Sequence, residues 1–99
     1  MRNIKTDEDG LITMRVHEFV IQRDIERSDL AAISTRSALF MSDIKMSFHD
    51  EYSEHVVDVK SLLGMLLVPI KAGTTIRLVT QGKDEEEALH FIYDWFMVG

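Results

Sequence analysis

Hydrophobic residues alternate with polar ones, or recur at helical spacing, in seven segments of the chain. The alternation is cleanest at 43–49, where Ile44, Met46 and Phe48 fall on one side, as in a half-buried strand. Runs rich in β-branched and aromatic residues predict three more strands, at 14–22, 56–60 and 74–80.

Three segments have the period of a helix. The first begins at Ser28 or Asp29 and runs to about residue 39. The second is short, from Ser61 to about residue 67, and Pro69 stops it. The third begins at Asp84, which is expected to cap it, and carries a broad apolar stripe of Ala88, Leu89, Ile92, Trp95 and Phe96.

The order of these elements predicts the fold class. Strand, helix, strand, strand, helix, strand and helix, with a local hairpin, favour an α+β open-faced sandwich. One four-stranded antiparallel sheet would carry three helices on one face and meet solvent with the other. We interpret residues 1–13 as a polar N-terminal extension, in which a short strand around residues 11–13 can form, and residues 14–99 as one domain.

Charge and composition narrow the range of partners. The formal net charge is −6, from 11 basic and 17 acidic residues, which argues against nucleic acid or an anionic membrane as the main partner. The absence of cysteine excludes disulfides, thiolate nucleophiles and zinc–thiolate sites. Residues 1–10 lack the apolar segment of a signal peptide, so a cytoplasmic protein is expected.

The sequence gives little evidence for catalytic or metal-binding groups. His49 and His55 flank the predicted hairpin turn and could share a metal, but surface imidazoles are commoner. The acidic run at 84–87 is better explained by the positive end of a helix dipole than by a cation. A serine hydrolase would need a strand–turn–helix nucleophile elbow, which the chain lacks. We therefore expect no enzyme activity, no cofactor and no metal.

The segment around Ser61 has two interpretations. Its hydroxyl can cap the following helix by accepting an otherwise unpaired backbone N–H. The apolar run at 62–68 is also too dense to form one narrow buried stripe, so part of it would remain at the surface as a docking patch.

This segment and the element order resemble the HPr family, the histidine-containing phosphocarrier proteins of the bacterial sugar phosphotransferase system. The resemblance is carried by three stretches: Val59-Lys60-Ser61-Leu62-Leu63-Gly64-Met65, Ala72-Gly73-Thr74 with Ile76 and Leu78, and Gly82-Lys83-Asp84-Glu85 with Ala88-Leu89. They are similar to the family's regulatory-serine segment, its turn into the fourth strand and the start of its last helix.

The family's phosphohistidine motif is absent. Counting back from Asp43 without gaps places Glu26 at the histidine position, Ser28 at the arginine and Asp29 at the proline. None of the four histidines precedes the first helix. Phosphohistidine transfer needs a nucleophilic imidazole beside groups that stabilise the phosphoryl oxygens, so transfer of that kind is not expected.

The resemblance implies a regulatory role instead. Ser61 would be the acceptor of phosphate from an HPr kinase/phosphorylase that uses ATP, and the phosphoprotein would bind a catabolite-control transcription factor. The implied docking residues are Lys60, Leu62, Leu63, Met65 and Leu66. Two alternatives remain open: a binding or self-assembling module that keeps only the fold, and a phosphocarrier with an atypical acceptor.

Overall fold

The computed structural model describes residues 2–5 and 13–98. The strand expected around residues 11–13 therefore lies almost wholly outside the described residues. The elements, in chain order, are β1 (Arg2–Lys5), β2 (Thr13–Val20), α1 (Arg27–Ser37), β3 (Asp43–His49), β4 (Glu54–Asp58), α2 (Leu62–Leu66), β5 (Thr75–Gln81) and α3 (Glu85–Val98).

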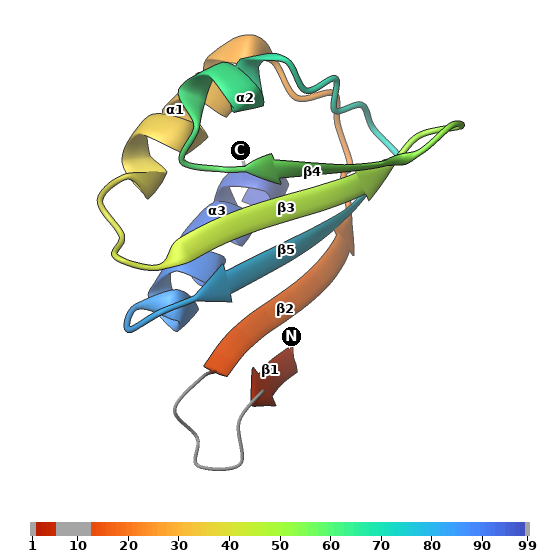
Figure 1. Cartoon of the computed structure of the whole chain (residues 1–99). Coiled ribbons are helices and arrows are strands. Elements are labelled where there is room, and N and C mark those ends of the chain that lie inside the picture. The colour runs from red at the N-terminus through yellow and green to blue at the C-terminus, as the bar shows by residue number, and fades with distance from the viewer. Residues whose placement is uncertain (1, 6–12, 99) are drawn as a thin grey trace.

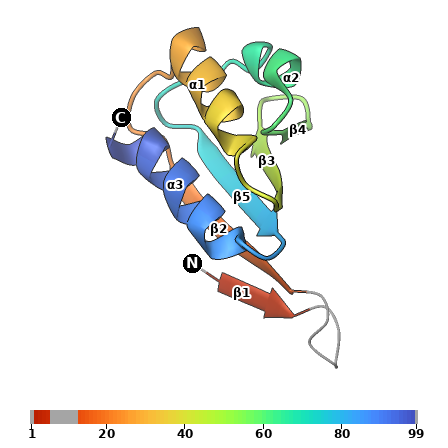
Figure 2. The ribbon, with the colours of Figure 1, turned by 90° about the vertical axis from the view of Figure 1, so that its left-hand side faces the viewer.

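The strands form one antiparallel sheet in the order β1-β2-β5-β3-β4 (Figure 1). The predicted four-stranded sheet is confirmed in β2, β5, β3 and β4. The prediction did not include β1, which pairs with β2 at one edge and gives the sheet a fifth strand. The three helices lie on one side of the sheet (Figure 2), which confirms the open-faced α+β sandwich.

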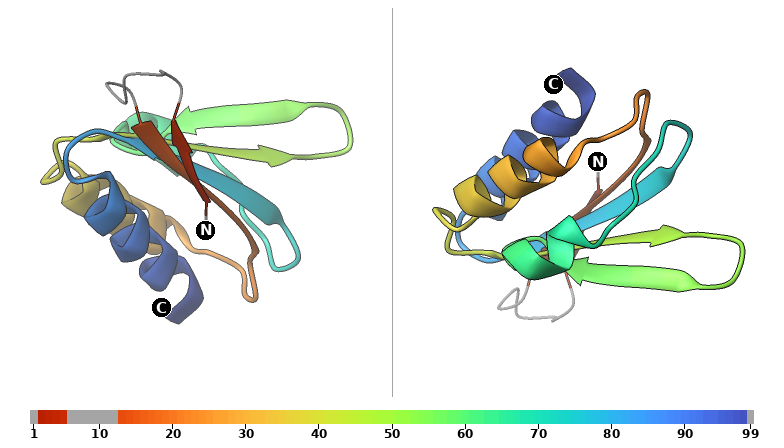
Figure 3. Two further views of the ribbon diagram at one scale, coloured as in Figure 1. Left: turned by 90° about the horizontal axis from the view of Figure 1, so that it is seen from below. Right: turned by 90° about the horizontal axis from the view of Figure 1, so that it is seen from above.

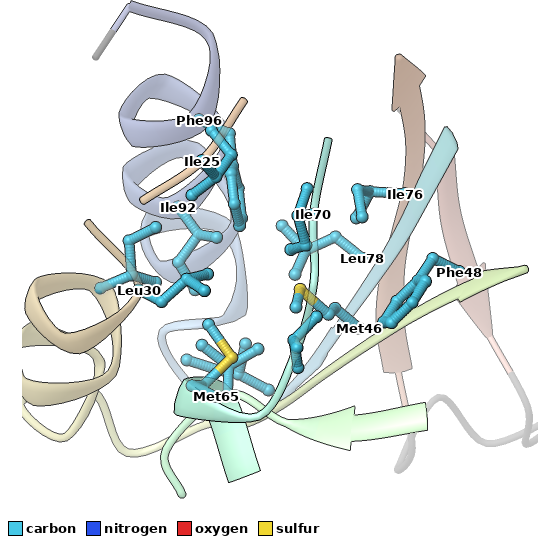
Figure 4. Close-up of a cluster of buried hydrophobic side chains, with 14 of the residues drawn as sticks. Ile25, Leu30, Met46, Phe48, Met65, Ile70, Ile76, Leu78, Ile92 and Phe96 are labelled. Carbon is cyan, nitrogen blue, oxygen red and sulfur yellow. The ribbon is translucent and has the colours of Figure 1, made fainter. Parts of the chain in front are cut away.

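The core fills the space between the sheet and the helices. Alternate residues of β3 and β5 point into it, so that Met46 stands opposite Leu78 in the register of the two strands. Leu30 of α1 and Ile92 of α3 approach them from the helical layer (Figure 4). The alternation read from the sequence at 43–49 is confirmed residue by residue in the burial of β3.

Asp84 precedes α3, as predicted, but its carboxylate does not serve that helix. It accepts hydrogen bonds from the Met41 N–H at 2.8 Å, and from the N–H and hydroxyl of Ser42 at 2.9 and 2.5 Å. These bonds, first the one from the Ser42 hydroxyl and then the one from the Met41 N–H, lower the pKa of Asp84. The residue therefore ties the turn between α1 and β3 to the start of α3, and the expected capping role is corrected.

The β3–β4 hairpin projects beyond the rest of the molecule (Figure 3). Asp50, in the turn between the two strands, holds its tip. The Asp50 carboxylate accepts the N–H groups of Tyr52 and Ser53 at 2.8 and 3.0 Å and lies 2.6 Å from Nε2 of His55. The His55 ring in turn stacks on Phe48, with 5.1 Å between the ring centroids.

These hydrogen bonds make the hairpin tip sensitive to acid. The Tyr52 N–H, the His55 ring and the Ser53 N–H together lower the pKa of Asp50 from 3.8 to about 2. Because the folded-state pKa is the lower one, the stabilisation is present above pH 3.8 and is lost as the pH falls toward about 2. We expect Asp50→Asn to remove this part of the acid dependence, which urea titrations of both proteins at several pH values would measure. An identical loss of stability on acidification in both proteins would contradict the assignment to Asp50.

Candidate functional site

Ser61 stands at the start of α2 and is exposed to solvent. Its backbone is extended, with φ −86° and ψ 105°, and its Oγ accepts the Gly64 N–H at 3.2 Å. Its own N–H donates to the carbonyl of Asp58 at 2.9 Å. The predicted N-cap is confirmed, and the cap leaves the Ser61 side chain at the surface.

The leucines that surround Ser61 make an exposed apolar surface. Leu62, Leu63 and Leu67 are 46%, 73% and 72% exposed, and we call these three residues the α2 patch. The sequence predicted the first two, while Leu67 was not among the expected docking residues. Apolar side chains this exposed and this close together are typical of a surface that another molecule covers.

Three further residues had been expected in the docking surface. Leu66 is half-buried. Lys60 is half-buried, and its Nζ donates to the carbonyl of Phe40 at 2.6 Å. Met65 is completely buried and belongs to the core with Leu30 (Figure 4), so its expected place in the docking surface is corrected. A one-turn helix must bury one side to hold its place, and here that side is Met65.

A shallow groove of about 330 Å³ continues from the α2 patch toward the start of α1. Leu66 and Leu67 belong to its lining from the α2 side, and Ile25 and Arg27 from the α1 side. Ser61 is next to Leu62 of the α2 patch, and Glu26 lies between Ile25 and Arg27 of the groove, so both candidate positions adjoin this surface.

Glu26, which the count back from Asp43 aligned with the histidine position, is the N-cap residue of α1. Its N–H donates to Oδ2 of Asp29 at 3.3 Å, and the same oxygen accepts from Nη1 of Arg23 at 3.2 Å. The position thus carries a carboxylate, and the neighbouring cation of Arg23 is paired with a second carboxylate. A nucleophilic imidazole, which phosphohistidine transfer needs, is missing from this position.

The four histidines lie elsewhere, with His90 on α3 and the other three on the strands. His17 lies on β2 and its ring packs against Tyr93 of α3, with 4.8 Å between the ring centroids. Burial is the main cause that lowers the pKa of His17. His49 and His55 each pair with one carboxylate of the hairpin, Glu54 at 3.2 Å and Asp50 at 2.6 Å. Within residues 2–5 and 13–98, no three imidazole or carboxylate groups are placed to share a metal ion. None of the helices in those residues is long and apolar enough to span a membrane.

Gly64 is a part of the site that sequence reasoning missed. A Cβ built on it would stand 3.1 Å from Oγ and 3.4 Å from Cβ of Ser61, tighter than most contacts of this kind. The glycine therefore leaves the room in which the Ser61 hydroxyl reaches the backbone.

A double-mutant cycle should show this coupling. Alanine at position 64 gains about 0.5–1 kcal/mol over glycine within a helix, but it displaces a cap worth about 1 kcal/mol. We expect Gly64→Ala to leave the free energy of unfolding nearly unchanged in the native chain, and to raise it by about 0.5–1 kcal/mol in a Ser61→Ala background. Urea denaturation of the four proteins measures both values, and equal effects in the two backgrounds would rule the coupling out.

The fold is that of solved phosphocarrier structures. A histidine-containing phosphocarrier protein from Mycoplasma superposes with a TM-score of 0.73 at 17% identity, covering 86% of this chain and 100% of that one. Phosphocarrier protein HPr from Bacillus anthracis gives 0.71 at 22% identity, covering 85% and 98%. Crh of Bacillus subtilis, described as a catabolite repression protein and as an intertwined dimer with a swapped domain, gives 0.58 at 24%, covering 76% and 82%.

Sequence similarity identifies the family, which the shared fold alone does not. The HPr-like protein Crh of Bacillus subtilis is 30% identical over 74 residues, which are 71% of this chain and 87% of Crh. Phosphocarrier protein HPr of Cupriavidus necator is 34% identical over 59 residues, which are 60% of this chain and 62% of that protein. Residues 30–97 match the model of the family PTS-HPr, described as the PTS HPr component phosphorylation site. The matched range includes Ser61 and begins after Glu26, and the chain belongs to the HPr family.

Proposed function

We propose that this chain is a regulatory member of the HPr family, phosphorylated on Ser61 and recognised through the surface around it. One observation carries the proposal: an exposed Ser61 adjoins an exposed apolar patch. The gapless count that assigns Glu26 to the family's phosphohistidine position supports it, since Glu26 is the N-cap residue of α1. Two of the curated relatives are HPr-like proteins named Crh, and one Crh structure is described as a catabolite repression protein.

Phosphorylation would change this surface electrostatically. A phosphate adds about two negative charges and three strong acceptor oxygens at neutral pH. On Ser61 these charges would stand beside Leu62 and Leu63, so a partner could bind apolar and anionic groups together. A partner with a cation next to an apolar pocket would then distinguish the phosphorylated form.

The proposed enzyme partner is an HPr kinase/phosphorylase, and the proposed reader is a catabolite-control transcription factor. Both partners, and the cytoplasmic setting in which ATP is available, are inferred from the family. In this role the chain accepts a phosphoryl group and binds other proteins, and it catalyses no reaction of its own.

The kinase reaction tests the proposal directly. The chain, Ser61→Ala and Ser28→Ala are incubated with an HPr kinase/phosphorylase and ATP and examined by intact-protein mass spectrometry. Ser28 is also exposed at a helix start and is therefore the matched control. We expect one phosphate on the native chain and on Ser28→Ala, and none on Ser61→Ala. No phosphate on the native chain, or phosphate that survives Ser61→Ala, would reject the proposal.

A second reaction distinguishes the phosphocarrier alternative from the regulatory role. Phosphoenolpyruvate and enzyme I would give an acid-labile phosphate if a carrier site were present. We expect no labelling, because the N-cap position of α1 carries Glu26 and its neighbour Arg23 is paired with Asp29. Acid-labile phosphate on the chain would favour the carrier function over the regulatory one.

Self-association is a second candidate, favoured by the exposure of Leu63 and Leu67 and by the intertwined dimer described for Crh. Light scattering over a wide concentration range tests it. A constant monomer mass would remove this candidate, and a dimer that dissociates on Leu63→Ala would support it.

A further inference from the structure

β4 forms one edge of the sheet, opposite the edge that β1 forms (Figure 1). One side of β4 pairs with β3 along its whole length, from His49 opposite Glu54 to Lys45 opposite Asp58. On its other side no strand lies within the part of the chain that the structure describes. An unpaired edge of this kind presents backbone donors and acceptors that another strand can use.

The hydrogen-bonding phase of β4 identifies the outward groups. The Val59 N–H donates to the Ile44 carbonyl at 3.0 Å, one position beyond the pair of Lys45 and Asp58 that ends the ladder. In an antiparallel ladder, residues alternate between bonding to the partner strand and pointing away from it. The backbone N–H and C=O groups of Val56 therefore point outward, at the middle of the edge.

The side chains at this edge have a definite chemical pattern. Val56 is 64% exposed on the solvent face of the sheet. Glu54 and Asp58, two residues to either side, fall on the same face, and their side chains are 52% and 48% exposed. Glu54 lies 3.2 Å from Nε2 of His49, and Asp58 lies 3.2 Å from Nζ of Lys45 and also accepts the Lys60 N–H at 3.0 Å.

The edge is also held in place before anything binds. Asp50 fixes the turn through the backbone of Tyr52 and Ser53, and the His55 ring stacks on Phe48 at 5.1 Å. A strand that is already ordered loses less conformational entropy when it pairs, so less of the binding energy is spent on ordering.

We propose that β4 binds an extended segment of another protein as an additional strand, with an apolar residue beside Val56 and cationic residues beside Glu54 and Asp58. A second copy of β4 fits poorly. The antiparallel pairing with the most overlap, centred on Val56, would place Glu54 opposite Asp58 twice, and like charges directly opposed destabilise a sheet. The net charge of −6 also favours a basic partner over a copy of this chain.

The test uses two blocked peptides and amide-resolved NMR of the full chain. The first peptide is acetyl-Thr-Lys-Thr-Val-Thr-Lys-Thr-amide, and the second carries Glu in place of both Lys. We expect the lysine peptide to shift the Val56 amide signal and slow its hydrogen exchange, and the glutamate peptide to bind about tenfold more weakly. No change at Val56 with the lysine peptide, or equal affinity for the two peptides, would overturn the proposal.

Two variants separate the backbone and charge contributions. Val56→Pro removes only an outward N–H, which an edge strand tolerates, and should abolish binding, whereas Val56→Thr should keep it. Thermal unfolding checks that both variants fold. Glu54→Lys provides a test independent of the proline, because it should weaken the lysine peptide and strengthen the glutamate peptide. Unchanged binding by Val56→Pro, or protection of the Val56 amide by self-association without peptide, would each overturn the proposal.

Discussion

Gly82→Ala is expected to lower the free energy of unfolding by about 3 kcal/mol, a large part of the stability of a small domain. Gly82 has φ +149°, a backbone conformation that residues with a Cβ rarely adopt. A Cβ there would stand 2.6 Å from Oγ and 2.7 Å from Cα of Ser42. Ser42 is fully buried and bonded to Asp84 through both its N–H and its hydroxyl, so it has little freedom to move away.

Gly73→Ala is the matched control for this prediction. Gly73 also has a positive φ, +92°, but a Cβ built on it meets nothing within 4 Å. Its replacement should cost only backbone strain, about 1 kcal/mol. Urea denaturation of the two variants separates strain from steric contact, and equal losses would show that the approach of Gly82 to Ser42 contributes nothing.

The elements that could be predicted from the sequence are those with a local signal. At 43–49 the alternation of apolar and polar residues directly reports which side of β3 is buried. At Ser61 a good capping residue precedes a short apolar run, and the cap forms as predicted. In both cases the residues that decide the structure are neighbours in the chain.

The features that could not be predicted depend on distant partners. Asp84 has the sequence context of a helix cap, but its carboxylate reaches Met41 and Ser42, more than forty positions earlier. β1 is four residues long, and only its pairing with β2 makes it a strand. No periodicity within four residues can indicate such a pairing.

The candidate site divides in the same way. That Ser61 begins α2 followed from capping chemistry. The start of α1 was predicted too late, because Ser28 and Asp29 were the expected caps, whereas Glu26 is the N-cap residue and the helix begins at Arg27. Which leucines of α2 are exposed could not be predicted, because apolar residues occur all around its single turn. Only the position of the core decides that Met65 is buried and Leu63 is exposed.

This difference leads to the second large prediction. Met65→Ala should lower the free energy of unfolding by about 3 kcal/mol, because it removes most of a fully buried side chain and leaves a cavity beside the core. Leu63→Ala, two positions earlier and 73% exposed, should change it by less than about 0.5 kcal/mol. Guanidinium denaturation of both variants measures the difference.

For partner binding we expect the opposite order of effects, with Leu63→Ala the more damaging change and Met65→Ala the milder one. If the α2 patch is the surface that a partner covers, Leu63→Ala should weaken binding of the Ser61-phosphorylated chain to a catabolite-control transcription factor about tenfold, as expected for an apolar side chain lost from an interface. Met65→Ala, assayed where it remains folded, should bind nearly as the native chain does, because its side chain never reaches the surface. Calorimetric titration of the two phosphoproteins measures this. A Leu63→Ala protein that binds normally would move the docking surface away from α2, whereas weak binding by a folded Met65→Ala protein would mean that the partner reads the shape of the helix rather than its exposed leucines.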